Sequence, residues 1–383
     1  MKKIVLLLAA VSVAAGASAE TLDGTYVKNQ WKHFFTADAS QTEINVTAGI
    51  KFDPTHQNGG IYDRIYLVNR SASNAKRGLY SVDTVNETSS SRLAMADDGS
   101  GNVDSPSGLA VDSSGNAYVS VGAAPSVWKV TDPSGTATET EMLGNYGSGT
   151  GDDDPGTIAM VPTGFGGGYT AGSDLLVFDV GLDNNDTNAV SVLDSGSTVG
   201  SPSYTTIWQE YNTTGFRGAA SSADGNVYLA HYTLATDELN GTTNAYVLRL
   251  DSAGNTERIF LDVNAADVAK LDDAITINQT DGSLWMAIED TDATRDIYRV
   301  DVANAVATNG DYLASTTLVI EDSDCGNVGV DAMAISPDGM FLALGNPSGQ
   351  DSMYVYTIPE PATVGMFAFL GIVMLWIRRK FAI

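Results

Sequence analysis

Short apolar runs alternate with polar turns along most of the chain, and one arrangement of them recurs. It consists of an apolar run with small residues, a turn centred on glycine, a second apolar run, a loop, and a third run rich in Val, Tyr, Leu and Trp. The clearest copy, PSGLAVDSSGNAYVS, covers residues 106–120 and is followed by SVWKV at 126–130. Leu109 and Val111 alternate with Ala110 and Asp112, which is the period of a β-strand. The pattern predicts strands joined by tight hairpins, where glycine enters positive φ without penalty.

The copies return at a regular spacing. Clear ones begin at Gly218, Asp273 and Asp331, and looser ones begin near Gly49 and Thr157. Successive turn glycines are separated by 55, 53, 57, 57 and 57 residues; these are Gly60, Gly115, Gly168, Gly225, Gly282 and Gly339. A period near 50 residues with several short strands is typical of β-propeller blades. We therefore predict an all-β, six-bladed propeller of antiparallel sheets over residues 20–358. Two β-sandwich domains are the alternative, and they leave the period unexplained.

The sixth copy is one strand short, because Thr357 and Ile358 lead directly into Pro359. Closed propellers commonly take such a strand from the opposite terminus, which removes the open sheet edge. We expect a strand from between Thr25 and Phe35 to pair beside residues 353–356.

The clear copies, with PSGLAVDSSGNAYVS the best, resemble NHL-type propeller repeats, whose typical unit is shorter than this one. The resemblance covers about four of the six units. It implies a fold and no particular activity.

The first 19 residues have the features of a secretory signal peptide. Lys2 and Lys3 precede an apolar run over residues 4–15, and Ala17 and Ala19 satisfy the small-residue rule for signal peptidase. We expect cleavage before Glu20. A retained anchor is the alternative, but the run is shorter than the roughly 20 apolar residues that span a bilayer.

Residues 359–383 have the features of a second targeting segment. Pro359, Glu360 and Pro361 precede an apolar stretch over 362–377, expected to form a helix, and Arg378, Arg379 and Lys380 follow it. The basic cluster would stay in the cytoplasm and leave the body outside. This order resembles the PEP-CTERM sorting signal of Gram-negative bacteria. The resemblance implies recognition by an exosortase-like enzyme, removal of the tail, and delivery to the cell surface or extracellular matrix, usually in species that make exopolysaccharide. A plain C-terminal anchor is the alternative.

The composition narrows the range of partners. Acidic residues outnumber basic ones 47 to 20, for a formal charge of −27, and such a surface repels nucleic acid and anionic membranes. We therefore expect no nucleic-acid partner, and contact with a membrane only through the C-terminal segment before processing. Cys325 is the sole cysteine, so no intramolecular disulfide forms.

Carboxylates are the only abundant candidates for chemistry, and no catalytic motif singles out a catalytic residue. His33, His56 and His231 are far apart, and the acidic groups lie in loops: Asp152 to Asp154, Asp183 with Asp186, Glu289 with Asp290 and Asp292, and Asp322 with Asp324. Asp273 and Asp331 occupy the same place in the fifth and sixth copies, immediately before the innermost run. A more distant likeness to gluconolactonase-type propellers, which hold a divalent ion in the channel, points to these two as metal ligands. Oxygen ligands select a hard cation such as Ca²⁺.

Together these features predict an exported binding or structural module associated with extracellular polysaccharide, with signal peptidase and an exosortase-like enzyme as processing partners. The alternative is a Ca²⁺-dependent hydrolase of the lactonase or phosphoesterase type with Asp273 and Asp331 as ion ligands. A third possibility is a purely structural protein without a ligand.

Overall fold

The computed structural model describes a set of ranges between residues 47 and 358. These ranges are 47–70, 77–83, 88–89, 106–121, 126–144, 155–180, 187–211, 216–231, 235–236, 243–263, 268–290, 295–308, 311–321, 330, 332–345 and 353–358. The regular elements in them are β-strands, and no helix within these ranges has the length and apolar character to cross a membrane. The predicted signal peptide, the predicted closing strand between Thr25 and Phe35, the segment 359–383 and Cys325 lie outside the described residues.

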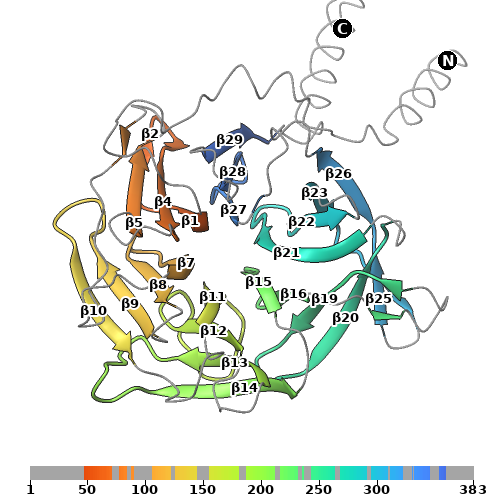
Figure 1. Cartoon of the computed structure of the whole chain (residues 1–383), viewed down its shortest axis with the longest axis horizontal. Coiled ribbons are helices and arrows are strands. Elements are labelled where there is room, and N and C mark those ends of the chain that lie inside the picture. Colours follow the sequence, from red (N-terminus) through yellow and green to blue (C-terminus); the bar gives the residue numbers. More distant parts are fainter. Residues whose placement is uncertain are drawn as a thin grey trace, which may run out of the picture.

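Six antiparallel sheets surround one axis, which confirms the predicted six-bladed propeller (Figure 1). Blade one contains β1 (Thr47–Phe52), β4 (Arg64–Asn69), β5 (Gly78–Asp83) and β6 (Thr88–Ser89), with the small hairpin β2 (Gln57–Asn58) and β3 (Ile61–Tyr62) beside them. Blade two contains β7 (Pro106–Val111), β8 (Ala117–Val121), β9 (Ser126–Thr131) and β10 (Thr138–Leu143). Blade three contains β11 (Pro155–Met160), β12 (Leu175–Val180), β13 (Thr187–Leu193) and β14 (Tyr204–Tyr211).

The remaining three blades follow in chain order. Blade four contains β15 (Phe216–Ser221), β16 (Val227–His231), β19 (Tyr246–Leu250) and β20 (Thr256–Leu261), and the hairpin β17 (Ala235–Thr236) and β18 (Thr243–Asn244) lies between its middle strands in sequence. Blade five contains β21 (Val268–Ile277), β22 (Leu284–Asp290), β23 (Arg295–Val300) and β26 (Thr316–Ile320). Blade six contributes β27 (Ala332–Ile335), β28 (Phe341–Gly345) and β29 (Met353–Thr357) within the described ranges. In every blade the first strand lies nearest the axis (Figure 1).

The apolar core is divided among the six interfaces between blades. Side chains on the inner strands alternate, so that one face of a blade packs on the preceding blade and the other on the following one. Ile50 and Phe52 of blade one, for example, pack with Ala332 and Val355 of blade six. Five further buried clusters join blades one and two, two and three, three and four, four and five, and five and six. The ring is therefore closed by side-chain packing among the described residues, and burial of each large aliphatic side chain contributes about 1.5–3 kcal/mol.

The recurring turn has a common hydrogen-bonding scheme, which explains its sequence signature. In five of the six blades a buried polar residue follows the innermost strand: Asp53, Asp112, Ser222, Asn278 or Ser336. In blade two, the Asp112 carboxylate accepts hydrogen bonds from the main-chain N–H groups of Ser114 and Asn116, both at 2.9 Å, and from the Tyr118 hydroxyl at 3.1 Å. All six turn glycines identified in the sequence have positive φ, between 73° and 92°. The polar side chain stabilises the turn by accepting hydrogen bonds from its N–H groups, and the glycine adopts the positive φ that the turn requires.

Three of these turn glycines also lie against the preceding blade. A Cβ atom on Gly115 would lie 2.9 Å from Thr55 Oγ1, and one on Gly225 would lie 2.5 Å from the carbonyl oxygen of Gly164. A Cβ atom on Gly339 would lie 2.7 Å from Asn278 Oδ1, whereas one on Gly282 would meet no atom within 4 Å. The turns of adjacent blades are thus packed together on one face of the ring.

One connection leaves its own blade, a feature that the sequence did not predict. Between β23 and β26 of blade five, the chain forms β24 (Val306–Thr308) and β25 (Asp311–Ala314), and β25 pairs in parallel with β20 of blade four (Figure 1). The guanidinium of Arg249, which is ion-paired with Glu257, lies 4.9 Å from the centre of the Tyr312 ring. We call residues 301–308 and 311–315 the inter-blade clasp, because they add two strands of blade five's connection to the sheet of blade four.

Candidate functional site

The innermost strands enclose a central cavity of about 350 Å³, open solvent included. Small and apolar side chains dominate its wall, among them Gly49, Gly108, Ala219, Ile275 and Ala332. The strands approach closely, since a Cβ atom on Gly49 would lie 2.7 Å from that of Leu109. Each innermost strand is the last in its sheet, so within the described residues its inner edge has no β partner. Main-chain N–H and C=O groups therefore face the channel.

Lys51 is the one charged residue among the described residues of the channel wall. It alternates along β1 with Ile50 and Phe52, which are buried between blades six and one. Its side chain is half-buried, and the surface that it keeps faces the confined space of the channel. In the described part of the chain no ion pair or hydrogen bond of Lys51 is found. Burial lowers the pKa of its ammonium to about 8, because the charged form loses hydration without gaining a partner.

The two predicted metal ligands, Asp273 and Asp331, are close in sequence to residues that line the channel, but whether their side chains converge there stays a prediction. Asp273 belongs to β21, at a register shift between Leu271 and Ile275, and its side chain is not among those described. Asp331 lies outside the described residues and directly precedes Ala332. Ile275 and Ala332 both line the channel. Among the described residues, no group of three His, Cys, Asp or Glu side chains could hold a metal ion.

Similar register shifts mark the start of the innermost strands in blades one to five. A bulge at this point bends the strand and changes the direction of a side chain near the mouth of the ring. The alternation seen in the sequence could not show these shifts, because an extra residue in a strand leaves no fixed signature in composition.

The buried carboxylates of the turns are occupied in the fold. Asp53 accepts hydrogen bonds from the N–H and hydroxyl of Thr55 at 2.9 and 2.6 Å and from the Tyr66 hydroxyl at 2.8 Å, and Arg64 lies 3.6 Å away. Burial, followed by the hydrogen bond to Asp53, raises the pKa of Tyr66 well above its usual value. Burial and the Asp112 carboxylate have the same effect on the pKa of Tyr118. These carboxylates stabilise turns and have little capacity left for a ligand.

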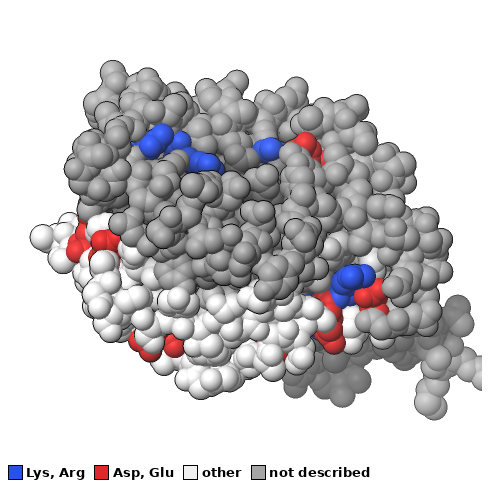
Figure 2. All heavy atoms as spheres, turned by 60° about the horizontal axis from the view of Figure 1, so that its bottom comes forward, with Lys and Arg blue, Asp and Glu red and all other residues white. Residues whose placement is uncertain are grey.

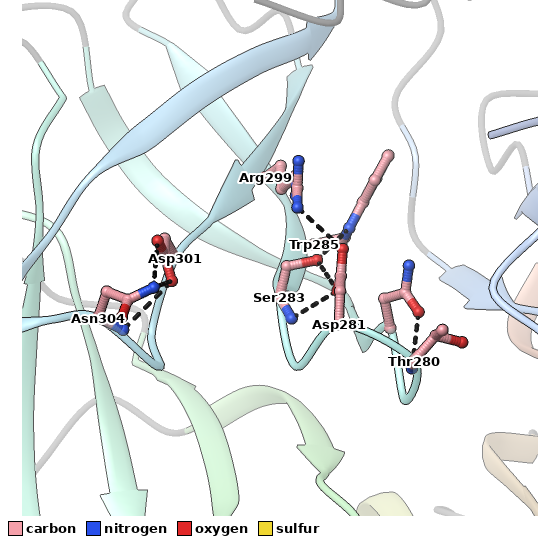
Figure 3. A network of polar contacts seen from close by, with 8 residues as sticks. Thr280, Asp281, Ser283, Trp285, Arg299, Asp301 and Asn304 are labelled. Carbon is pink, nitrogen blue, oxygen red and sulfur yellow. Dashed lines mark hydrogen bonds and ion pairs between the residues drawn. The ribbon is translucent and has the colours of Figure 1, made fainter. Parts of the chain in front are cut away.

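The turn of blade five carries a comparable network near the surface (Figure 3). Asp281 accepts hydrogen bonds from the N–H and hydroxyl of Ser283 at 2.8 and 2.6 Å, and from Arg299 at 2.8 Å. Trp285 Nε1 donates to the Ser283 hydroxyl at 3.0 Å, and Asp301 accepts hydrogen bonds from Asn304 in the next turn. Every carboxylate labelled in this view is engaged with a residue of its own blade.

The other predicted acidic and histidine sites are partly described. Glu289 and Asp290 were expected in a loop, but this is wrong, because β22 continues to Asp290 and pairs with β23. Glu289 forms an ion pair with Arg295 at 3.2 Å, and His56 Nδ1 lies 2.6 Å from the buried carboxylate of Asp63. The His231 and Asp290 side chains are not described. Residues outside the described ranges are His33, Asp152 to Asp154, Asp183, Asp186, Asp292, Asp322 and Asp324. On the face in Figure 2, the described acidic side chains form separate groups.

No protein-family model and no curated protein sequence matches this chain. Solved structures do share its architecture. A luciferin-regenerating enzyme superposes with a TM-score of 0.52 at 13% identity, over 84% of this chain and 94% of that chain. A gluconolactonase from Xanthomonas campestris gives a TM-score of 0.50 at 11% identity, over 84% and 88%. The PQQ domain of a pyranose dehydrogenase from Coprinopsis cinerea gives 0.50 at 12% identity, over 82% and 93%. At these identities the likeness shows the propeller fold alone.

Proposed function

We propose that the protein is an exported β-propeller that acts as a binding or structural module at the cell surface or in an extracellular polysaccharide matrix. The observation that carries this proposal is the make-up of the channel wall. Its described residues are small or apolar apart from Thr157 and Lys51. A hydrolase that works through a central Ca²⁺ needs several oxygen ligands converging on one point, and a lysine in the wall repels a divalent cation. The described wall therefore favours a scaffold whose ligands bind on its outer surfaces.

The proposed location rests on the two ends of the chain. Lys2 and Lys3 with the apolar run after them would direct export, and signal peptidase would cleave after Ala19. Pro359 to Pro361 with the basic cluster at Arg378 and Arg379 would direct the chain to an exosortase-like enzyme. Intact-mass measurement of protein isolated from the native host tests both steps. A mass beginning at Glu20 and lacking the tail supports them, and a species that retains Arg378 contradicts the sorting step.

Binding is tested with the propeller alone, residues 20–358, and exopolysaccharide purified from the same host. We expect saturable binding in calorimetry and no hydrolysis of lactone or phosphoester substrates. Hydrolysis of such a substrate by the purified protein would refute the non-catalytic role. A complete lack of binding to the matrix polysaccharide would refute the polysaccharide association and leave a purely structural role.

A Ca²⁺-dependent hydrolase of the lactonase or phosphoesterase type is the second candidate, and the register shift at Asp273 is the observation that favours it. A bulge in the innermost strand can direct a carboxylate into the channel mouth, and Asp331 precedes the equivalent strand of blade six. Titration of Ca²⁺ into chelator-treated protein tests this, with Asp273→Asn and Asp331→Asn compared with Asp301→Asn as the matched surface control. Binding that is lost in the first two variants and kept in the control would replace the first proposal by this one.

A further inference from the structure

We infer that the central channel holds one small monovalent anion, bound by the Lys51 ammonium and by main-chain N–H groups of the innermost strands. This inference concerns the inside of the ring and does not depend on what binds outside it. It rests on the position of one lysine, the charges around it, and the free strand edges.

The first argument is the lack of a counter-charge in the described wall. Lys51 shares the channel wall with Gly49, Gly108, Leu109 and other uncharged residues. The carboxylate nearest in sequence, Asp53, is held by Thr55 of its own turn and by Tyr66 and Arg64 of β4. An ammonium enclosed by protein without a counter-charge is costly, and a mobile anion is the simplest partner that can reach it.

The second argument is the supply of hydrogen-bond donors. The inner edges of β1, β7, β11, β15, β21 and β27 have no β partner in the described residues, so N–H groups from several blades face the channel. N–H groups directed at one point form favourable anion sites, because each adds a fixed partial positive charge. Lys51 supplies the full charge, and the N–H groups of the strand edges, which alternate there with C=O groups, supply hydrogen-bond donors beside it.

The third argument concerns the kind of anion. The cavity is confined, with about 350 Å³ of space, open solvent included. One lysine balances a single negative charge, whereas a doubly charged phosphate would keep an unbalanced charge in a confined space. Chloride and acetate therefore fit better than phosphate. The lowered pKa of Lys51 agrees with an ammonium that has no partner in the protein alone, and a bound anion would raise that pKa again.

The experiment measures the protonation of Lys51 with and without small anions. Competitive acetylation of residues 20–358, read by mass spectrometry across a pH series, reports the neutral amine of each lysine. Sodium chloride, acetate and phosphate are compared with a bulky sulfonate at the same ionic strength. We expect chloride or acetate to raise the Lys51 pKa by about one unit, which lowers its acetylation at pH 7 about tenfold. Lys129, which lies over the Tyr118 ring, is the internal control and should not change.

A second measurement uses Lys51→Met with Lys129→Met as the matched control. Chloride should raise the melting temperature of the wild type and of Lys129→Met relative to the sulfonate, and should leave Lys51→Met unchanged. An identical chloride response in all three proteins, or a Lys51 pKa that no small anion alters, would overturn the inference. If Lys51→Met does not fold, acetylation of the wild type decides the question.

Discussion

Replacing Gly225 with alanine should destabilise the ring much more than the same change at Gly282. Both glycines have positive φ, 92° and 73°. An alanine at either position should therefore lower the free energy of unfolding by about 1 kcal/mol through its backbone conformation alone. At Gly225 the new methyl group would also lie 2.5 Å from the carbonyl carbon and oxygen of Gly164 and 2.8 Å from the nitrogen of Phe165. These are main-chain atoms, which no side-chain rotation can move aside. Relieving the overlap must shift one blade against the other, at about 2–3 kcal/mol more.

The two variants separate packing between blades from the conformational cost of the turn. Urea unfolding of residues 20–358, followed by circular dichroism, should give a loss of about 3–4 kcal/mol for Gly225→Ala and about 1 kcal/mol for Gly282→Ala. Gly282 is a suitable control because a Cβ atom there meets nothing within 4 Å. Equal losses in the two variants would refute the claim that the turn of blade four is packed against blade three.

Four other perturbations test the buried charges, the turns and the closure of the ring. Lys51→Met should stabilise the fold at pH 7 by up to about 3 kcal/mol in buffers without small anions, because the folded-state pKa of about 8 lies below the unfolded value of 10.5. The gain should shrink between pH 8 and 10.5, as the wild type loses the proton, and a gain that is constant with pH would show that the buried charge is not its cause. Burial raises the pKa of Tyr228 to about 12, so above pH 10 unfolding releases its proton and the free energy of unfolding should fall as the pH rises. In urea titrations at about pH 9 to 11, the free energy of unfolding of Tyr228→Phe should fall less steeply than that of the wild type. Asp112→Ala should lower the free energy of unfolding in urea by about 3 kcal/mol, because it leaves the Tyr118 hydroxyl and the N–H groups of the turn without their acceptor. Asp301 is half-exposed, and Asp301→Ala should lower it by less than about 1 kcal/mol. Deleting residues 20–36 should lower the melting temperature markedly if they close blade six, and an unchanged value would refute that closure.

The all-β class and the number of blades could be predicted from the sequence because their signals are local. A strand alternates with period two, and the turn after each innermost strand needs a glycine at positive φ, so the six glycines mark the blades directly. The buried polar residue that precedes the glycine in five of the six blades, such as Asp112, belongs to the same local unit.

The inter-blade clasp and the position of Lys51 could not be predicted in this way. The parallel pairing of Phe260 with Leu313 joins residues far apart in the chain. The sequence DYLA at 311–314 is typical of a short edge strand and does not indicate which sheet it joins. Whether Lys51 meets bulk water or a narrow channel depends on closure of the whole ring, which no short window contains. The convergence of Asp273 and Asp331 depends on the same geometry and stays a prediction.

The inter-blade clasp also sets an order of events for a chain that emerges from its N-terminus. After β20 has formed, the outer edge of blade four still lacks its neighbour, because β25 belongs to the connection between β23 and β26 of the next blade. An open strand edge is a template for pairing with other chains. During synthesis or export, blade four therefore stays open to mispairing until most of blade five has followed. A ribosome or translocation pause between Leu261 and Asp311 would be expected to favour aggregation more than a pause after Ala314.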